Sequence, residues 1–189
     1  LYFPFPYLYN VIMTLKKHTI SFEETKQFSK LFLEYINGEP EIRSFYSYTP
    51  HIESFKKAIA DKSKENTNRK LLVDVLNSQY SKIPNNTLTI SNINLLLDKN
   101  TFTVCTGHQL CLFTGPLYFI YKIISTINLA ESLKKKYPEN NFVPVYWMAS
   151  EDHDFEEVQS INLFGKKITW NNEAPKGPVG SLNTASVNL

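Results

Sequence analysis

The spacing of apolar and polar residues changes near residue 100 and divides the chain into two regions. In the first region Ser21 and Glu24 have the spacing of a capping box, and apolar residues then follow at helical intervals until Gly38. The remaining helical stretches are 54–81, interrupted near 66–68, and 91–97. We therefore predict a mostly helical N-terminal region over residues 13–98.

The second region has the order strand, loop, helix, strand. Its predicted elements are a strand over 101–106, a loop over 107–115, a helix over 116–136, a strand over 142–148 and an acidic loop over 149–157. This order predicts two parallel strands joined by a crossover helix, and Pro144 favours an edge position for the second strand. The apolar residues expected on the buried face of the helix are Leu117, Ile120, Tyr121, Ile124, Ile127, Ala130 and Leu133.

The two ends of the chain depart from this pattern. Residues 159–189 predict a β-hairpin around Gly165 followed by the start of an insertion that is cut short. Two strands and one helix do not make a stable sheet, so we expect 99–158 to be the start of an incomplete core. Residues 1–12 lack the basic segment of a signal peptide and precede Met13, which we expect to be the true start, with 1–12 a non-native or upstream extension.

The amino-acid composition argues against several functional classes of protein. The 189 residues are 42% hydrophobic, and the net charge of +2 provides no strong field for nucleic acid. No apolar run reaches the roughly 20 residues that span a bilayer, so we expect no membrane partner. The two cysteines, Cys105 and Cys111, imply no disulfide framework and favour a cytoplasmic protein. With His108 they have the spacing of a metal half-site, but we expect both to pack as small apolar residues.

The loop between the first strand and the helix is the first candidate site. Glycine-containing loops at a helix N-terminus bind anions, because unpaired N–H groups and the helix dipole point at the loop. Gly107 can take a positive φ, and Gly115 lets the backbone approach a ligand closely. The other candidate ligand-binding residues are Thr106, Gln109, Thr114 and Lys122. His108 is either a proton donor or a loop histidine packed under the helix.

The second candidate site follows the second strand. Glu151, Asp152, His153 and Asp154 place three carboxylates and an imidazole in four residues, an arrangement that self-repulsion disfavours unless a ligand compensates it. In an open α/β sheet this strand end lies at the binding edge, where His153 is a candidate general base. The alternative is a solvated acidic loop that caps the next short helix. Two polar strand ends therefore predict one composite site.

The residues from Thr106 to Lys122 and from Pro144 to Phe155 resemble the bacillithiol-biosynthesis cysteine-adding enzymes, a family of cysteine ligases. The segment from Gly177 to Gly180 resembles a further motif of that family. His108 and Cys111 depart from the residues that many members have. The resemblance implies a Rossmann-like core related to nucleotidyltransferases, a C-terminal coiled coil and a protein more than twice this length.

The same resemblance implies that cysteine is joined to glucosaminyl-malate by an amide bond. We expect catalytic roles for His153, Asp152 and His108, and binding roles for Glu151 and Asp154 together with the loop residues. We further expect ATP, with Mg²⁺, as a reactant, no tightly bound cofactor, no bound metal, a homodimeric full-length protein and an inactive fragment. The alternatives are a metal-dependent hydrolase or transferase that uses the Glu151–Asp154 cluster, and a non-catalytic binding fragment.

Overall fold

The computed structural model describes residues 16, 18–171 and 177–187, and these residues form two compact units. The first unit ends at Ser54 and the second runs from Phe55 to the end of the chain, so the predicted domain boundary at residue 98 lies within the second unit. No helix in the described part of the chain is long and apolar enough to cross a membrane.

The first unit is helical. It contains α1 (Phe22–Thr25), α2 (Lys30–Asn37) and two 3-10 helices, Pro40–Phe45 and Ile52–Ser54. The capping box is confirmed, because Ser21 and Glu24 each accept a hydrogen bond from the other's backbone N–H. Gly38 ends α2 in the left-handed conformation, as its position predicts. The capping box begins the short helix α1, and Lys26, which has a positive φ, separates it from α2, where the apolar residues at helical spacing lie.

The second unit is built around two parallel strands. Its elements are α3 (Phe55–Lys62), α4 (Arg69–Tyr80), α5 (Thr87–Leu95), β1 (Thr101–His108), α6 (Leu117–Lys136), β2 (Asn141–Met148), α7 (Phe155–Val158), β3 (Ser160–Leu163) and β4 (Lys166–Thr169). The predicted strand–helix–strand order and the hairpin around Gly165 are confirmed. β1 is two residues longer than predicted, and α5 begins four residues earlier.

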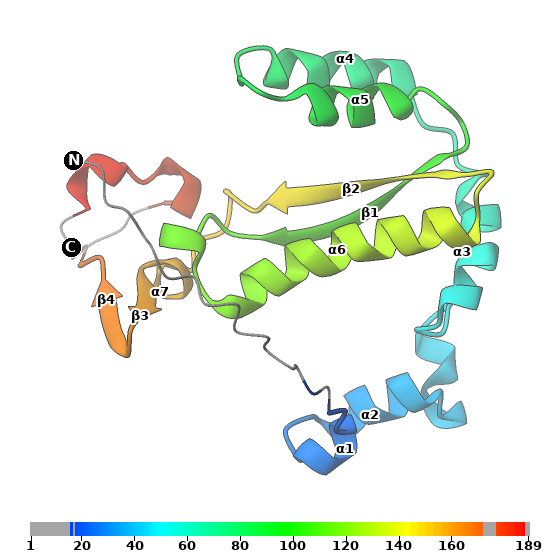
Figure 1. The fold of residues 1–189 in the computed structure, drawn as a ribbon, viewed down its shortest axis with the longest axis horizontal. Coiled ribbons are helices and arrows are strands. Elements are labelled where there is room, and N and C mark those ends of the chain that lie inside the picture. The colour runs from blue at the N-terminus through cyan, green and yellow to red at the C-terminus, as the bar shows by residue number, and fades with distance from the viewer. Residues whose placement is uncertain (1–15, 17, 172–176, 188–189) are drawn as a thin grey trace, which may run out of the picture. The chain divides into compact units, whose positions relative to one another are not determined.

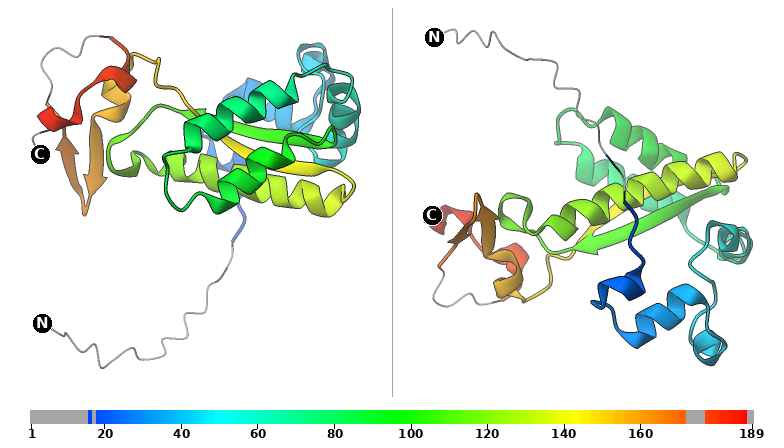
Figure 2. Two further views of the ribbon diagram at one scale, coloured as in Figure 1. Left: turned by 90° about the horizontal axis from the view of Figure 1, so that it is seen from above. Right: turned by 60° about the horizontal axis from the view of Figure 1, so that its bottom comes forward.

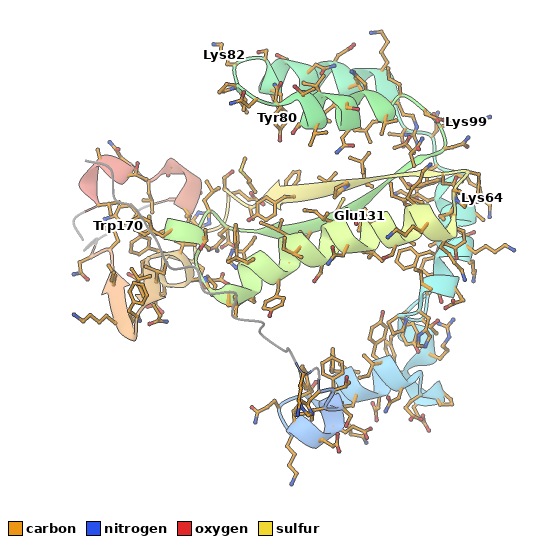
Figure 3. The ribbon with its side chains drawn as sticks, viewed as in Figure 1. Lys64, Tyr80, Lys82, Lys99, Glu131 and Trp170 are labelled. Carbon is orange, nitrogen blue, oxygen red and sulfur yellow. The ribbon has the colours of Figure 1, made fainter. Side chains whose placement is uncertain are left out.

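Helices cover both faces of the β1–β2 sheet (Figures 1 and 2). α6 packs along one face, and the α4–α5 pair lies on the other. Side chains of α4, α5 and β2 form the core between them: Val73, Ile93, Leu96 and Val143 are buried, and Tyr80 points inward from the end of α4 (Figure 3). At the start of β1, Arg69 donates to the carbonyl oxygens of Leu96 and Thr101, at 2.9 and 3.1 Å.

The expected packing of Cys105 was wrong. Cys105 is exposed, although its register partner Val145 packs against the core. Parallel partners point to the same face of a sheet, so Cys105 shares the α4–α5 face. α5 contacts β2, and Val73 of α4 packs in the same core with Val143, whereas Cys105 on the neighbouring strand β1 remains accessible.

The predicted buried face of α6 was largely wrong. The buried positions are Thr126, Ala130 and Leu133, and Phe119 and Ile123 continue the same stripe toward the N-terminus. The predicted residues that are exposed are Leu117, Ile120, Tyr121, Ile124 and Ile127. At 3.6 residues per turn these two sets lie on opposite sides of the helix. Since both sides are apolar in its N-terminal half, periodicity alone could not choose between them.

Substitution on the two sides of α6 tests this packing. Leu133 is 0% exposed, so Leu133→Ala should lower the free energy of unfolding of this chain by about 2–5 kcal/mol. Ile124 is 49% exposed, and Ile124→Ala should change it by less than about 1 kcal/mol. Urea unfolding followed by circular dichroism measures both; a larger loss for Ile124→Ala would show that the predicted face was the buried one.

Candidate active site at the shared strand edge

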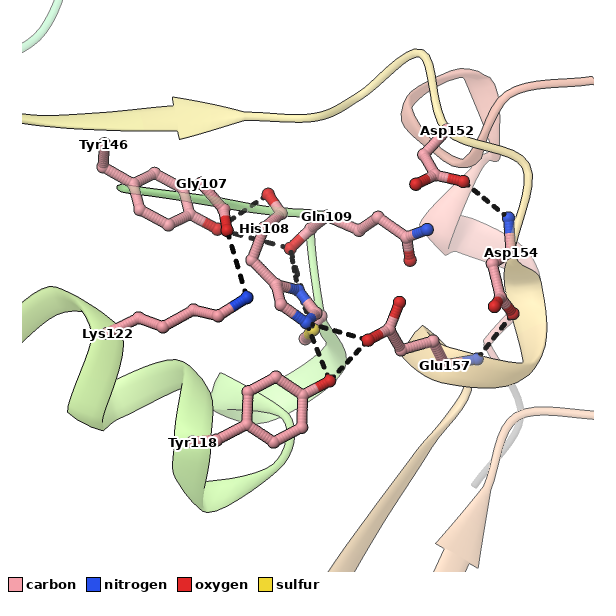
Figure 4. Close-up of polar contacts among 10 residues, drawn as sticks. Gly107, His108, Gln109, Tyr118, Lys122, Tyr146, Asp152, Asp154 and Glu157 are labelled. Atoms are coloured by element: carbon pink, nitrogen blue, oxygen red, sulfur yellow. Dashed lines mark hydrogen bonds and ion pairs between the residues drawn. The ribbon is translucent and has the colours of Figure 1, made fainter. Parts of the chain in front are cut away.

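The two candidate motifs begin at the same edge of the sheet. β1 and β2 pair in register, so that His108 at the end of β1 lies opposite Met148 at the end of β2. The backbone N–H of Ala149 continues the pairing by donating to the carbonyl oxygen of His108 at 3.0 Å. The segments that follow the two strands therefore start side by side, and Figure 4 shows their side chains facing one another.

The two glycines serve the packing of the protein itself. Gly107 belongs to β1 and does not use the positive φ that glycine permits. A Cβ there would lie 3.1 Å from the carbonyl oxygen of Trp147, so a larger residue would require β2 to shift by a few tenths of an ångström. Gly115 has a φ of +60°, and a Cβ on it would lie 2.5 Å from the Cβ of Cys111. The expected close approach of Gly115 is therefore to Cys111, and its contact with a ligand stays a prediction.

The remaining loop residues lie around the start of α6. Thr106 is half-buried in β1, whereas Thr114 is exposed just before the helix. Pro116 is the N-cap of α6 and provides no side-chain acceptor for the first-turn N–H groups. Lys122 reaches back, as predicted, and its Nζ donates to the carbonyl oxygen of Gly107 at 3.3 Å.

His108 is the buried centre of a hydrogen-bond network whose other side chains reach the surface (Figure 4). It is 6% exposed, and its Nε2 lies 2.8 Å from the hydroxyl of Tyr118 and 3.1 Å from Oε1 of Glu157. The hydroxyl of Tyr118 also donates to the same Glu157 oxygen at 2.5 Å. The other ring nitrogen, Nδ1, lies 3.1 Å from the carbonyl oxygen of Gln109. This geometry fits a packed, positioning histidine, and a catalytic role for His108 stays a prediction.

Sequence reasoning did not identify Tyr118 and Glu157 as site residues. Glu157 follows Asp154 by three residues, which is the spacing of an N-cap and its partner. In the structure the Asp154 carboxylate accepts from the backbone N–H of Glu157 at 3.1 Å and caps α7. The three-residue spacing of Asp154 and Glu157 was therefore the feature of the sequence that could have identified Glu157. It also shows that the alternative interpretation, an acidic loop that caps the next helix, is correct for Asp154.

The Cys111 thiol is a packing group in this network. Its Sγ lies 3.4 Å from Nδ1 of His108, and burial followed by the charge of Glu157 raises the pKa of the thiol. A raised pKa keeps sulfur protonated and disfavours a nucleophilic or metal-binding thiolate. Cys105 is exposed on the sheet, so the spacing of a metal half-site does not correspond to a site. Among the described residues, no group of three or more His, Cys, Asp or Glu side chains is placed to hold a metal ion.

The remaining carboxylates of the acidic segment are held in different ways. Oδ1 of Asp152 accepts from the backbone N–H groups of His153 and Asp154, at 2.6 and 3.1 Å. Glu151 accepts from the indole N–H of Trp147 at 3.4 Å. The side chain of His153 is exposed at the edge of the site. The acidic segment is thus an ordered turn in which Glu151, Asp152 and Asp154 have separate hydrogen-bond partners.

Gln109 connects the two motifs. Its side chain is directed toward Asp152 (Figure 4), yet the residue is only 2% exposed and neither polar atom of its carboxamide completes a hydrogen bond within the described structure. The nearby carboxamide is the first cause of the lowered pKa of Asp152, and the backbone N–H of Asp154 is the second. We conclude that the amide stabilises the ionised carboxylate by proximity, without the geometry of a full hydrogen bond.

The segment from Gly177 to Gly180 fixes the backbone of the acidic turn. The N–H of Val179 donates to the carbonyl oxygen of Asp152 at 2.7 Å, and the N–H of Gly180 donates to that of Ser150 at 2.9 Å. A Cβ on Gly180 would lie 2.5 Å from the Cβ of Ser150, so only glycine fits. Val179 is itself buried in a small core with Phe155, Val158 and Trp170.

The titration of Tyr118 tests the network. Its hydrogen bond to Glu157 stabilises the neutral phenol and raises its pKa from 10 to about 12. The contact should therefore stabilise the fold fully below about pH 10 and be lost as the pH rises through about 12. The difference in absorbance at 295 nm between the natural protein and its Tyr118→Phe variant should have its midpoint near pH 12. Glu157→Gln should bring that midpoint back toward 10, and a natural midpoint already near 10 would rule out the contact.

Comparison with known proteins adds independent information. The family model for the N-terminal Rossmann-like domain of the bacillithiol biosynthesis protein BshC matches residues 15–189. Proteins named "Putative cysteine ligase BshC" are 57% identical over 170 residues in Christiangramia forsetii and 54% over 171 residues in Flavobacterium psychrophilum. A Bacillus thuringiensis protein of the same name is 37% identical over 158 residues. These matches cover 87%, 89% and 82% of this chain.

The chain spans about a third of the length of the relatives it matches, 32% for the first two and 29% for the third. The family model confirms the predicted Rossmann-like fold class, and the two parallel strands with their crossover helix agree with it. The match covers 175 of the 189 residues, from 15 to 189, and includes both motifs of the site. The chain therefore belongs to the BshC family of bacillithiol biosynthesis, of which it represents the N-terminal Rossmann-like domain.

Proposed function

We propose that the natural polypeptide containing this chain is a cysteine ligase of bacillithiol biosynthesis, which joins the carboxyl group of cysteine to the amino group of glucosaminyl-malate. The observation that carries the proposal is the composite site, in which the segments after β1 and β2 meet at one sheet edge. Ligands of open α/β sheets bind at this edge. The names of the relatives supply the reaction class.

Amide formation requires an uncharged amine that attacks a carboxyl carbon and then loses a proton. Among the residues that the structure describes at this edge, His153 has an exposed imidazole and is adjacent in sequence to the ionised Asp152. Imidazole accepts protons near neutral pH, so His153 is the proposed base. His108 is buried and hydrogen-bonded at both ring nitrogens, and its proposed role is to hold Tyr118 and Glu157 in place.

The start of α6 fits a phosphate group. Its first-turn N–H groups have no side-chain cap, and the exposed Thr114 precedes them. Such helix N-termini bind phosphate oxygens. ATP with Mg²⁺, if bound there, would convert a carboxylate oxygen of cysteine into a leaving group. Thr114 and the backbone of residues 117–118 are the groups proposed to hold its phosphate.

A metal-dependent hydrolase or transferase is not proposed. That hypothesis needs several side chains of the acidic segment to converge on one ion. Asp154 instead caps α7, and Glu151 is turned toward Trp147.

Direct assay of the natural polypeptide tests the proposal. With L-cysteine, glucosaminyl-malate, ATP and Mg²⁺ it should produce the amide, detected by mass spectrometry. His153→Ala should lower the rate by about 10²- to 10⁴-fold, the usual contribution of a general base.

His51→Ala is the matched control, because it removes an exposed imidazole from the first unit. It should leave the rate unchanged. Absence of amide with the natural polypeptide would contradict the proposed reaction, whereas a fully active His153→Ala variant would contradict only the role of His153.

A further inference from the structure

The acidic turn carries more negative charge than the protein neutralises. The segment 151–157 contains five carboxylates: Glu151, Asp152, Asp154, Glu156 and Glu157. No lysine or arginine in the described part of the chain forms an ion pair with any of them. Like charges at this spacing repel one another, so the turn favours a positively charged ligand.

Three of the carboxylates already have partners within the protein. Glu157 accepts from Tyr118, Asp154 caps α7, and Glu151 accepts from Trp147. Asp152 differs, because its side chain partners are backbone N–H groups of its own turn and its carboxylate faces Gln109. Asp152 is exposed, so a ligand can reach it from solvent.

Gln109 provides the second, independent observation. Its carboxamide is buried at 2% exposure, and both its nitrogen and its oxygen are without a hydrogen-bond partner in the described structure. An unpaired buried amide is costly, and native proteins rarely keep one without a role. The amide group lies beside Asp152, the exposed acidic side chain of the turn that faces it.

We infer that Asp152 and the carboxamide oxygen of Gln109 bind the primary ammonium group of a substrate. An ammonium group carries a positive charge and has N–H donors for both acceptors. Two acceptors are too few for a divalent cation, which needs more ligands in a fixed geometry. The nitrogen of the Gln109 carboxamide is the end nearer Asp152 in Figure 4, so binding requires the amide to turn its oxygen toward Asp152. With a small shift of the exposed Asp152 side chain, the ammonium would then occupy the position between the two acceptors.

Under the proposed function, the ammonium group has two possible sources. The inference rests on the proposed function only for the identity of these two substrates. One is the α-ammonium of cysteine, held while its carboxyl group reacts. The other is the ammonium of an amino sugar, held before it loses its proton.

Calorimetric binding to the natural polypeptide distinguishes the sources. The probes are L-cysteine, 3-mercaptopropionate, which is cysteine without the amino group, and D-glucosamine. One ammonium compound should bind, and 3-mercaptopropionate should bind more weakly than cysteine if cysteine is the source. Asp152→Asn should weaken the ammonium compound about 10- to 100-fold, as expected for loss of one charge-assisted hydrogen bond.

Glu156→Gln is the matched control, because it removes the same charge from the same segment at an exposed position. It should change the affinity for the ammonium compound less than about threefold, as expected for a screened surface charge.

Two results would overturn the inference. One is an equal loss of affinity in the two variants, and the other is equal binding of cysteine and 3-mercaptopropionate together with no binding of glucosamine. The comparison of probes needs no variant, so it decides even if Asp152→Asn does not fold. Amide formation with unchanged binding to Asp152→Asn would overturn the ammonium site alone, whereas ammonium binding without amide formation would overturn the proposed reaction alone.

Discussion

The in-register pairing of β1 with β2 is the constraint on which the site depends. It places His108 opposite Met148, so two segments separated by the whole of α6 leave the sheet at the same point. A slip of one residue would turn every side chain of a strand to the other face and would separate the two motifs. Gly107 lets β1 and β2 approach closely beside the site, because a Cβ there would lie only 3.1 Å from the carbonyl oxygen of Trp147.

Glu157 connects the two segments through its side chain, in addition to the backbone pairing of β1 with β2. Its carboxylate accepts from Tyr118 of α6 and contacts His108 of β1, so one oxygen on α7 joins the helix and the strand. The backbone bonds of Val179 and Gly180 hold the acidic turn from its other side. With its neighbours committed to such contacts, Asp152 is the carboxylate left facing Gln109 and solvent. Asp152 is thus the carboxylate of the turn that is both exposed and directed at the unpaired buried amide of Gln109.

The sequence was sufficient to predict the features that depend on local spacing. The Ser21 cap, the Gly38 stop, the parallel strands and the joining of two polar strand ends were all predicted, because each follows from a few neighbouring residues or from strand order. The predicted buried face of α6 was wrong because that helix is apolar on both sides, and only packing against the sheet selects one. The close contact of Gly107 with Trp147 could not be predicted from local spacing, because the two residues are forty positions apart in the sequence. The Glu157 contacts with Tyr118 and His108 likewise depend on tertiary structure, although the Asp154–Glu157 spacing was a usable signal.

A double-mutant cycle between Tyr118 and Glu157 tests whether the side chains of the two motifs are energetically coupled into one site. The free energy of unfolding of the natural polypeptide would be measured for Tyr118→Phe, Glu157→Ala and the double variant, with Glu156→Ala replacing Glu157→Ala in a control cycle. We expect a coupling of about 1 kcal/mol between Tyr118 and Glu157, and none between Tyr118 and Glu156. Additive effects in both cycles, within about 0.3 kcal/mol, would contradict a site in which Glu157 joins the two strand ends.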